Sequence, residues 1–173
     1  MNDTALQYRF RNICEITPEI LREIGIRAVC VDADNTLVVD STLKYIDGAI
    51  QAVEKIKAAG IPVTLVTNTT AIRAFFIGRK LGVPYVSLCY KPSPRGILKA
   101  AKKMKALPEH IGMIGDQIFA DVMAANRAGA IPLLVDPLKP EVLFGGHFRK
   151  LRRKETPILD KFDGEVGYYV DIR

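Results

Sequence analysis

Short apolar runs alternate with longer amphipathic segments along most of this chain. Five of the runs have the length and the residue types of strands that are buried on both faces, and these are expected at about 26–31, 62–66, 85–88, 111–114 and 131–135. Segments with apolar residues at helical spacing separate them, and helices are expected at about 48–59, 70–81, 94–107 and 118–128. This alternation predicts an α/β fold, in which a five-stranded parallel sheet is covered by helices on both faces in a Rossmann-like three-layer sandwich.

Glycine, proline and small polar residues mark the ends of the predicted helices. Three helical segments are followed by a glycine and then, two or three residues later, by a proline; the glycines are Gly60, Gly82 and Gly129. Glycine supplies the left-handed turn that ends a helix, and proline prevents the helix from continuing. At the other end of a helix, Asp47 is expected to cap the segment at 48–59.

The whole chain, residues 1–173, is interpreted as a single domain. Its core spans about 26–136, a helical segment occupies 1–25, and a basic extension without a further strand–helix unit occupies 137–173. A chain of 173 residues is long enough for one substantial core. The content of 49% hydrophobic and 25% charged residues is ordinary for a globular protein.

Composition also bounds the setting of the protein. The three cysteines form no CxxC pair, which favours a reducing, cytoplasmic location. The first residues lack the pattern of a signal peptide, and no apolar run approaches the ~20 residues of a membrane span. The net charge of +6 favours anionic partners without naming one.

Two carboxylates follow the first predicted strand directly. Asp32 and Asp34 are separated by one residue and lie where a central strand ends. Open α/β sheets bind ligands in the crevice at the carboxyl ends of their strands. Two like charges this close together are unfavourable unless a cation lies near them or one is protonated. A hard divalent cation, most simply Mg²⁺, therefore fits this position.

Polar side chains also follow three of the other predicted strands. Thr67 and Asn68 follow the second, Lys91 the third, and Asp116 the fourth, with Asp121 about one helical turn later. In a parallel sheet all of these strand ends open into one crevice. Carboxylates, a lysine, a hydroxyl and an amide that meet around a cation suit phosphoryl transfer, because the transferred group carries negative charge that must be neutralised.

These four stretches resemble the signatures of the haloacid dehalogenase superfamily, subclass IIIA, and of its YqeG-like family in particular. The stretches are Asp32-Ala33-Asp34-Asn35-Thr36, Val66-Thr67-Asn68, Lys91-Pro92 and the segment from Gly115 to Asp121. The resemblance covers about residues 16–159. One departure is Ala33, where a larger apolar residue is usual; it affects packing and leaves both carboxylates in place.

The resemblance implies a role for each of the four principal side chains. Asp32 is the expected nucleophile and a magnesium ligand, while Asp34 is the expected general acid and base, with its backbone carbonyl on the metal. Thr67 and Lys91 are expected to bind the phosphoryl group and the aspartyl-phosphate.

The remaining positions carry expectations with open alternatives. Asp116 is expected to bind the metal, directly or through water. Asp121 is expected either to bind the metal or to support the metal site or its lysine. Asn35, Thr36 and Asn68 are expected to bind substrate, although Asn35 and Thr36 can instead shape their loop. Asn68 and Thr67 are also plausible helix caps.

Members of the superfamily that this chain resembles often carry a cap domain that closes over small substrates. It is inserted after the first signature or between the second and the third. Here the first position holds only about residues 37–46 and the second only one predicted helix and one strand, so we expect no cap. An open crevice favours large or membrane-surface phosphates over small metabolites. The basic stretch 147–154 suggests peripheral contact with anionic lipid, against the alternative of a solvated helix with Leu151 packed inward. Nucleic acid is disfavoured because aromatic residues are sparse in this stretch.

The sequence thus predicts a Mg²⁺-dependent phosphomonoesterase that works through an aspartyl-phosphate. A specific alternative is a phosphatidylglycerophosphate phosphatase, because related mitochondrial enzymes act on that lipid. A second alternative is a non-catalytic phospho-acceptor or scaffold. In phospho-acceptor domains of the receiver type, the Asp that becomes phosphorylated follows the third strand. This chain has Lys91 there, which counts against the phospho-acceptor alternative.

Overall fold

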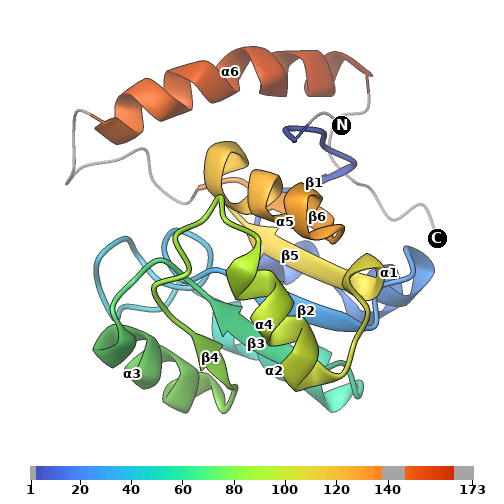
Figure 1. Ribbon diagram of the computed structural model, residues 1–173, viewed down its shortest axis with the longest axis vertical. Helices are drawn as coiled ribbons and strands as arrows, with labels where there is room; N and C mark the ends of the chain where they lie inside the picture. The colour runs from blue at the N-terminus through green and yellow to red at the C-terminus, as the bar shows by residue number, and fades with distance from the viewer. Residues whose placement is uncertain (1–2, 138–146, 166–173) are drawn as a thin grey trace.

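The computed structural model describes the backbone of residues 3–137 and 147–165 and the side chains of 3–137 and 153–162. These residues form one six-stranded sheet in which all neighbouring strands are parallel. The strands are β1 (Tyr8–Phe10), β2 (Ala28–Val31), β3 (Val63–Val66), β4 (Tyr85–Val86), β5 (Ile111–Gly115) and β6 (Ile131–Val135). Their order across the sheet is β1-β6-β5-β2-β3-β4, with helices on both faces (Figure 1). The predicted α/β fold class is confirmed.

The expected number of five strands is wrong, because β1 adds a sixth strand at one edge. β1 pairs with β6, and Phe10 lies opposite Val135. The strand has only three residues, and its central Arg9 interrupts the apolar pattern by which buried strands are recognised. Arg9 is nevertheless buried, and its Nε lies 2.9 Å from Oδ1 of Asp136, just after β6.

The helices follow the predicted sequence of elements. They are α1 (Pro18–Glu23), α2 (Ala49–Ala58), α3 (Ala71–Leu81), α4 (Arg95–Met104), α5 (Met123–Ala128) and α6 (His147–Glu165), with short helical turns η1 (Ile13–Glu15), η2 (Pro108–His110) and η3 (Ile118–Val122). The segment expected as one helix at 118–128 is divided, since η3 has π-helical geometry.

Two expected helix ends are also corrected. Asp47 does not cap α2; Gly48 occupies that position with φ of 81° and makes no side-chain capping bond. α4 ends at Met104 rather than near 107, because Lys105 adopts the left-handed conformation with φ of 53°.

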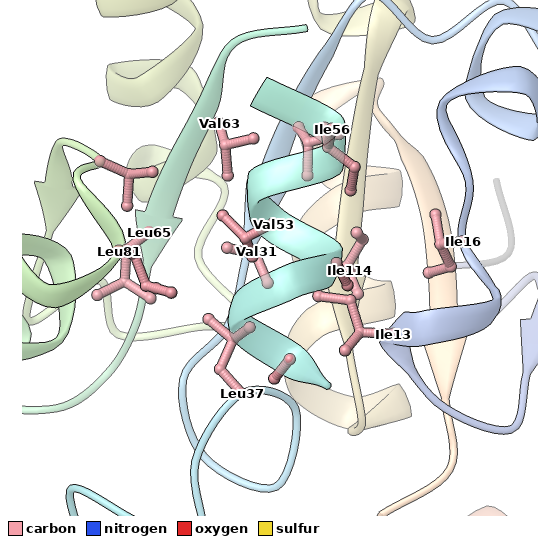
Figure 2. Close-up of a cluster of buried hydrophobic side chains, with 14 of the residues drawn as sticks. Ile13, Ile16, Val31, Leu37, Val53, Ile56, Val63, Leu65, Leu81 and Ile114 are labelled. Carbon is pink, nitrogen blue, oxygen red and sulfur yellow. The ribbon is translucent and has the colours of Figure 1, made fainter. Parts of the chain in front are cut away.

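The sheet separates two apolar clusters. Alternate residues of β2 point to opposite faces, so Val29 and Val31 join one cluster while Ala28 and Cys30 join the other. Figure 2 shows the first cluster, in which α2 places Val53 and Ile56 over the sheet. The second cluster lies under α4 and α5 and is built largely from alanines and other small residues. Small side chains let these two helices lie close to the sheet and to each other.

Helix α6 connects the C-terminal part of the chain to η3. Oε1 of buried Glu155 accepts hydrogen bonds from the backbone N–H groups of Ile118, at 2.8 Å, and Phe119. Of the basic stretch 147–154, the side chains of 147–152 lie outside the described residues, and Arg153 and Lys154 are exposed. Among the described helices, none combines the length and the apolar character that a membrane span requires.

Candidate active site

Neighbouring central strands deliver the first two carboxylates of the candidate site. Asp32 follows β2 directly, and its N–H donates to the carbonyl of Ile114 in β5 at 2.9 Å. Asp116 follows β5, and both carboxylates are buried. A Cβ atom at Gly115 would overlap the carboxyl group of Asp121. Glycine at position 115 therefore lets Asp121 reach the ends of the two strands.

Lys91 joins two of these carboxylates in a buried ion-pair cluster. Its Nζ lies 2.7 Å from Oδ1 of Asp32 and 2.5 Å from Oδ1 of Asp121. Oδ2 of Asp121 also accepts from the N–H of Gln117 at 3.1 Å, which fixes the start of η3. Because the side chains of Lys91, Asp32 and Asp121 are at most 7% exposed, water screens these charges weakly.

Three carboxylates of this site suit a hard cation. One ligand atom each from Asp32, Asp116 and Asp121 lies within 4.8 Å of the others, and all three residues are buried. Oxygen donors of this kind are those that Mg²⁺ prefers. The donor set therefore fits a hard cation, and metal binding by Asp32, Asp116 and Asp121 stays a prediction.

The charges in the cluster shift its ionisation equilibria in defined directions. Burial raises the pKa of Asp32 to about 6, opposed by the charge of Lys91 and assisted by that of Asp121. Burial alone would lower the pKa of Lys91, but the charges of Asp121 and Asp32 outweigh it, and the pKa of Lys91 is raised. Lys91 is thus held as an ammonium group, and a bound cation would favour the ionised form of Asp32.

Asp34 lies outside this cluster and is bound by an arginine instead. Nη2 and Nη1 of Arg73, in α3, lie 2.6 and 2.8 Å from the two carboxylate oxygens of Asp34. Arg73 also donates to the carbonyl of Thr42 at 2.6 Å and to Oγ1 of Thr69 at 3.0 Å. The guanidinium group therefore ties the loop after β2 to the N-terminal turn of α3.

The polar pair after β3 positions the loop that carries Lys91. Oδ1 of Asn68 accepts from the N–H of Lys91 at 2.8 Å, and its Nδ2 donates to the carbonyl of Lys91 at 3.3 Å. Thr67 is buried, and its Oγ1 accepts from the N–H of Thr69 at 3.3 Å. The structure thus shows Asn68 as a support for Lys91, while substrate contact by Thr67 and Asn68 stays a prediction.

The remaining predicted substrate ligands, Asn35 and Thr36, lie in the turn after β2. Asn35 has φ of 56° and donates its N–H to the carbonyl of Val38 at 2.8 Å. It also lines a hollow of about 380 Å³ together with Tyr45 and Lys44. The hydroxyl of Thr36 is closed off from solvent and makes no hydrogen bond within the part of the chain that the structure describes. Substrate binding by these two residues stays a prediction.

Two contributors to the site, Arg73 and Glu155, were not found from the sequence. In the sequence, Arg73 is one of several basic residues on a predicted helix. Only the fold shows that the first turn of α3 lies beside the loop after β2. Glu155 follows the basic stretch, and no spacing connects it with Ile118, the residue it caps. The sequence contained one indication of this kind, a charged residue near the start of a predicted helix that follows a signature. It applied to Arg73 and not to Glu155.

Comparison with known proteins identifies the class. A family model described as haloacid dehalogenase-like hydrolase matches residues 19–129, and the chain belongs to this family. Its fold is shared with a solved hydrolase of that superfamily from Ehrlichia chaffeensis, with a TM-score of 0.56 and 18% identity over 78% of this chain and 98% of the other.

Two curated relatives narrow the class to phosphatases. The chain is 34% identical to the probable phosphatase YqeG of Bacillus subtilis over 128 residues, which are 74% of each protein. It is 23% identical over 157 residues to phosphatidylglycerophosphate phosphatase 1 of Arabidopsis thaliana. That alignment covers 83% of this chain and 44% of the plant protein. The protein is therefore a phosphatase of the haloacid dehalogenase superfamily that is similar to YqeG.

Proposed function

We propose that this phosphatase hydrolyses phosphomonoesters in a Mg²⁺-dependent reaction with Asp32 as the nucleophile. The observation that carries the proposal is the buried cluster in which Lys91 lies between Asp32 and Asp121, with Asp116 beside them. Desolvating several charges is costly, and a chain that needed only stability would do as well with apolar residues there. A site that must bind and neutralise a phosphoryl group requires such charges.

The proposed reaction has two steps. Asp34 enters the cycle with a proton taken from solvent. In the first step, a carboxylate oxygen of Asp32 attacks phosphorus, the bond from phosphorus to the ester oxygen breaks, and Asp34 gives its proton to that leaving oxygen. In the second, Asp34 takes a proton from water, the water oxygen attacks phosphorus, and the bond to Asp32 breaks. Inorganic phosphate leaves, and both carboxyl groups return to their starting states.

Each of the neighbouring side chains supports one part of this sequence. Lys91 neutralises charge on the phosphoryl oxygens, and Thr67 holds the same group in place. Asp34 can carry a proton only after its carboxyl group turns away from Arg73, because both of its oxygens now accept from the guanidinium group. Arg73 thereby holds Asp34 in a defined position until a substrate arrives.

The metal would be held by Asp32, Asp116, Asp121 and the backbone carbonyl of Asp34. Bound there, Mg²⁺ supplies positive charge that offsets the charge of the phosphoryl group during transfer.

The substrate class follows from the proposed access to the crevice. Residues 32–48 contain no helix, and a single helix, α3, separates β3 from β4. We infer that no cap closes over the site and that large or membrane-surface phosphomonoesters are accepted. Phosphatidylglycerophosphate is the specific candidate, and the named activity of the Arabidopsis relative supports it.

A panel of phosphate esters tests the proposal. We expect the purified chain with Mg²⁺ to release phosphate from an aryl phosphate and, at higher kcat/KM, from phosphatidylglycerophosphate in mixed micelles. Sugar phosphates, nucleotides and phosphopeptides complete the panel, and chelation of divalent cations should abolish release. A long-lived aspartyl-phosphate without release would instead support the phospho-acceptor alternative, and binding without any turnover would support a scaffold.

A further inference from the structure

Most of the exposed large apolar side chains of the described chain gather around α3 and two loops beside it. Six of the eight such residues lie there: Leu43, Ile72, Phe75, Phe76, Leu88 and Tyr90. We call these six residues the apolar rim. Contiguous exposed apolar surface is unusual on a monomeric protein and marks sites of interaction.

Two hydrogen bonds bring the three segments of the apolar rim together, one between backbone groups and one from a side chain. The N–H of Leu88 donates to the carbonyl of Thr69, immediately before α3, at 3.2 Å. The carbonyl of Thr42, next to Leu43, accepts from Arg73 in the first turn of α3. The loop after β2, the start of α3 and the loop after β4 therefore form one continuous region at the carboxyl end of the sheet (Figure 1).

The outward face of α3 is apolar at its beginning and basic at its end. Ile72, Phe75 and Phe76 follow helical spacing, and Arg79 and Lys80 continue the same side of the helix. All five side chains are exposed, and Ile72 is 73% exposed. The opposite face of α3 packs against the core, and Ala74, Ile77 and Leu81 are buried there. Core packing therefore does not account for the apolar outward face.

Charge along this part of the chain has a single sign. Between Glu54 and Glu109 there is no Asp or Glu, while eleven Lys and Arg residues occur. The apolar residues Ile72 to Tyr90 all fall inside this stretch. An anionic surface would thus meet attraction along this stretch; the loop with Leu43 lies outside it and also carries Asp40.

The apolar rim also adjoins the candidate active site. Tyr90, which is 74% exposed, directly precedes Lys91 in the chain. Arg73, on the same helix as Ile72 and Phe76, binds Asp34. A surface that touches the apolar rim therefore lies next to the candidate active site.

We propose that the apolar rim is the docking surface of this protein for an anionic phospholipid bilayer. Apolar side chains would enter the region between headgroups and acyl chains, and Arg79 and Lys80 would lie at the level of the headgroup phosphates. This deepens the proposed function, on which it rests for the substrate, by assigning the face through which a phosphorylated headgroup reaches the site. It also moves membrane contact away from the stretch 147–154.

Two other occupants fit the apolar rim less well. A symmetric dimer across this face would enclose Arg79 and Lys80 of both copies, and α3 has no acidic residue to pair with them. Single-stranded nucleic acid needs ring faces open for stacking, whereas Phe75 and Phe76 pack edge to face with centroids 5.5 Å apart.

Vesicle flotation tests the proposal with the full chain. We expect binding to vesicles of phosphatidylcholine with about one third phosphatidylglycerol and none to phosphatidylcholine alone. The double substitution Ile72→Ser with Phe76→Ser should lower the partition coefficient about tenfold or more. Leu107→Ser is the matched control, because Leu107 is 61% exposed but lies beyond α4, at the opposite end of the sheet, and it should leave binding unchanged.

A second pair of variants tests the electrostatic part. Arg79→Glu with Lys80→Glu should weaken binding to anionic vesicles, whereas Lys102→Glu with Lys105→Glu, at the far end of α4, should have a much smaller effect. Hydrolysis of a soluble aryl phosphate is measured for every variant and should stay at the level of the unsubstituted chain. Vesicle binding without turnover would contradict only the proposed function, and turnover without vesicle binding only the docking surface.

Three further results overturn the proposal. One is equal flotation of the chain with and without the Ile72→Ser and Phe76→Ser changes. Another is self-association in the absence of vesicles that these changes abolish, which would assign the face to a second copy. The third is loss of binding to a single-stranded oligonucleotide through the same changes.

Discussion

Asp32 and Asp34 are separated by one residue, yet the structure gives them contrasting surroundings. Asp32 is 5% exposed and shares Lys91 with Asp121 inside the protein. The side chain of Asp34 is 23% exposed and is paired with Arg73 outside the buried cluster. The chain turns directly after β2, where the amides of Leu37 and Val38 both donate to the carbonyl of Ala33. This turn separates the two carboxylates.

The two environments suit different tasks in the proposed reaction. The carboxyl group of Asp32 is held fixed, and that of Asp34 can move. The buried Asp32–Lys91 pair has little access to water, which would keep Asp32 aligned for the proposed attack. The side chains of Asp34 and Arg73 are 23% and 16% exposed, so this pair can open more readily than the buried one. A nucleophile needs fixed geometry, whereas an acid that later acts as a base must change partners. Four substitutions break or sharpen this comparison.

Asp32→Asn is expected to have the largest effect. The amide cannot form the acyl-phosphate, so kcat should fall by about 10⁴-fold or more. The measurement is steady-state hydrolysis of an aryl phosphate, with circular dichroism to verify folding. Asp40→Asn, in the loop after β2, is the matched control and should keep wild-type activity. Turnover by the Asp32→Asn variant at the wild-type rate would exclude covalent catalysis through Asp32.

Lys91→Met tests the buried side of the comparison through stability. The substitution keeps the length of the side chain but leaves the carboxylates of Asp32 and Asp121 without their cation. The free energy of unfolding should fall by about 3–5 kcal/mol in urea denaturation without divalent cations.

The response of the same variant to Mg²⁺ tests the metal site independently of activity. Mg²⁺ should restore part of the stability lost by Lys91→Met, because it replaces the missing positive charge among the carboxylates. Lys99→Met, at an exposed position of α4, should alter neither the stability nor its response to Mg²⁺. An unchanged free energy of unfolding for Lys91→Met would argue against a tightly coupled ionic cluster.

Arg73→Ala tests the movable side of the comparison. Loss of the paired hydrogen bonds to Asp34 should lower kcat by about ten- to a hundredfold with little change in KM, because Asp34 loses its position. Arg73→Lys should restore activity only in part, since an ammonium group cannot bind both carboxylate oxygens in the same planar way. Arg79→Ala, two turns along the same helix, is the control. A rise in KM alone would instead place Arg73 in contact with substrate.

Asn68→Ala should give the smallest effect. Removing both hydrogen bonds to the backbone of Lys91 should lower the free energy of unfolding by about 1–2 kcal/mol, measured by thermal or urea denaturation. If stability is unchanged and only KM rises, Asn68 binds substrate, as its sequence motif suggests. The two outcomes separate support of the Lys91 loop from contact with the phosphoryl group.

The sequence predicted those parts of the fold and site that depend on local patterns. Apolar runs located β2, β3, β5 and β6 because each central strand is buried on both faces. The polar residues after those strands could be assigned to one crevice because parallel strands end on one side. Lys91 and Asp121 were correctly placed near Asp32 for this reason, although their roles in catalysis stay predictions.

The missed features depend on contacts between distant residues. β1 has three residues and a central arginine, and its assignment requires knowledge of its partner β6. Arg73 and Glu155 act on atoms 39 and 37 positions away in the chain, and no local pattern encodes such distances. Gly48 rather than Asp47 occupies the N-cap position of α2, because the backbone has a positive φ there. Tertiary geometry decided that position over capping preference.

The pairing of β1 with β6 has a consequence for folding during synthesis. Arg9 and Asp136, which are joined at that edge, are 127 positions apart. At a translation rate of about 5–20 residues per second, the first strand to leave the ribosome waits roughly 6–25 seconds for its partner. Pairing of β1 therefore completes the edge of the sheet only after every other strand has been synthesised.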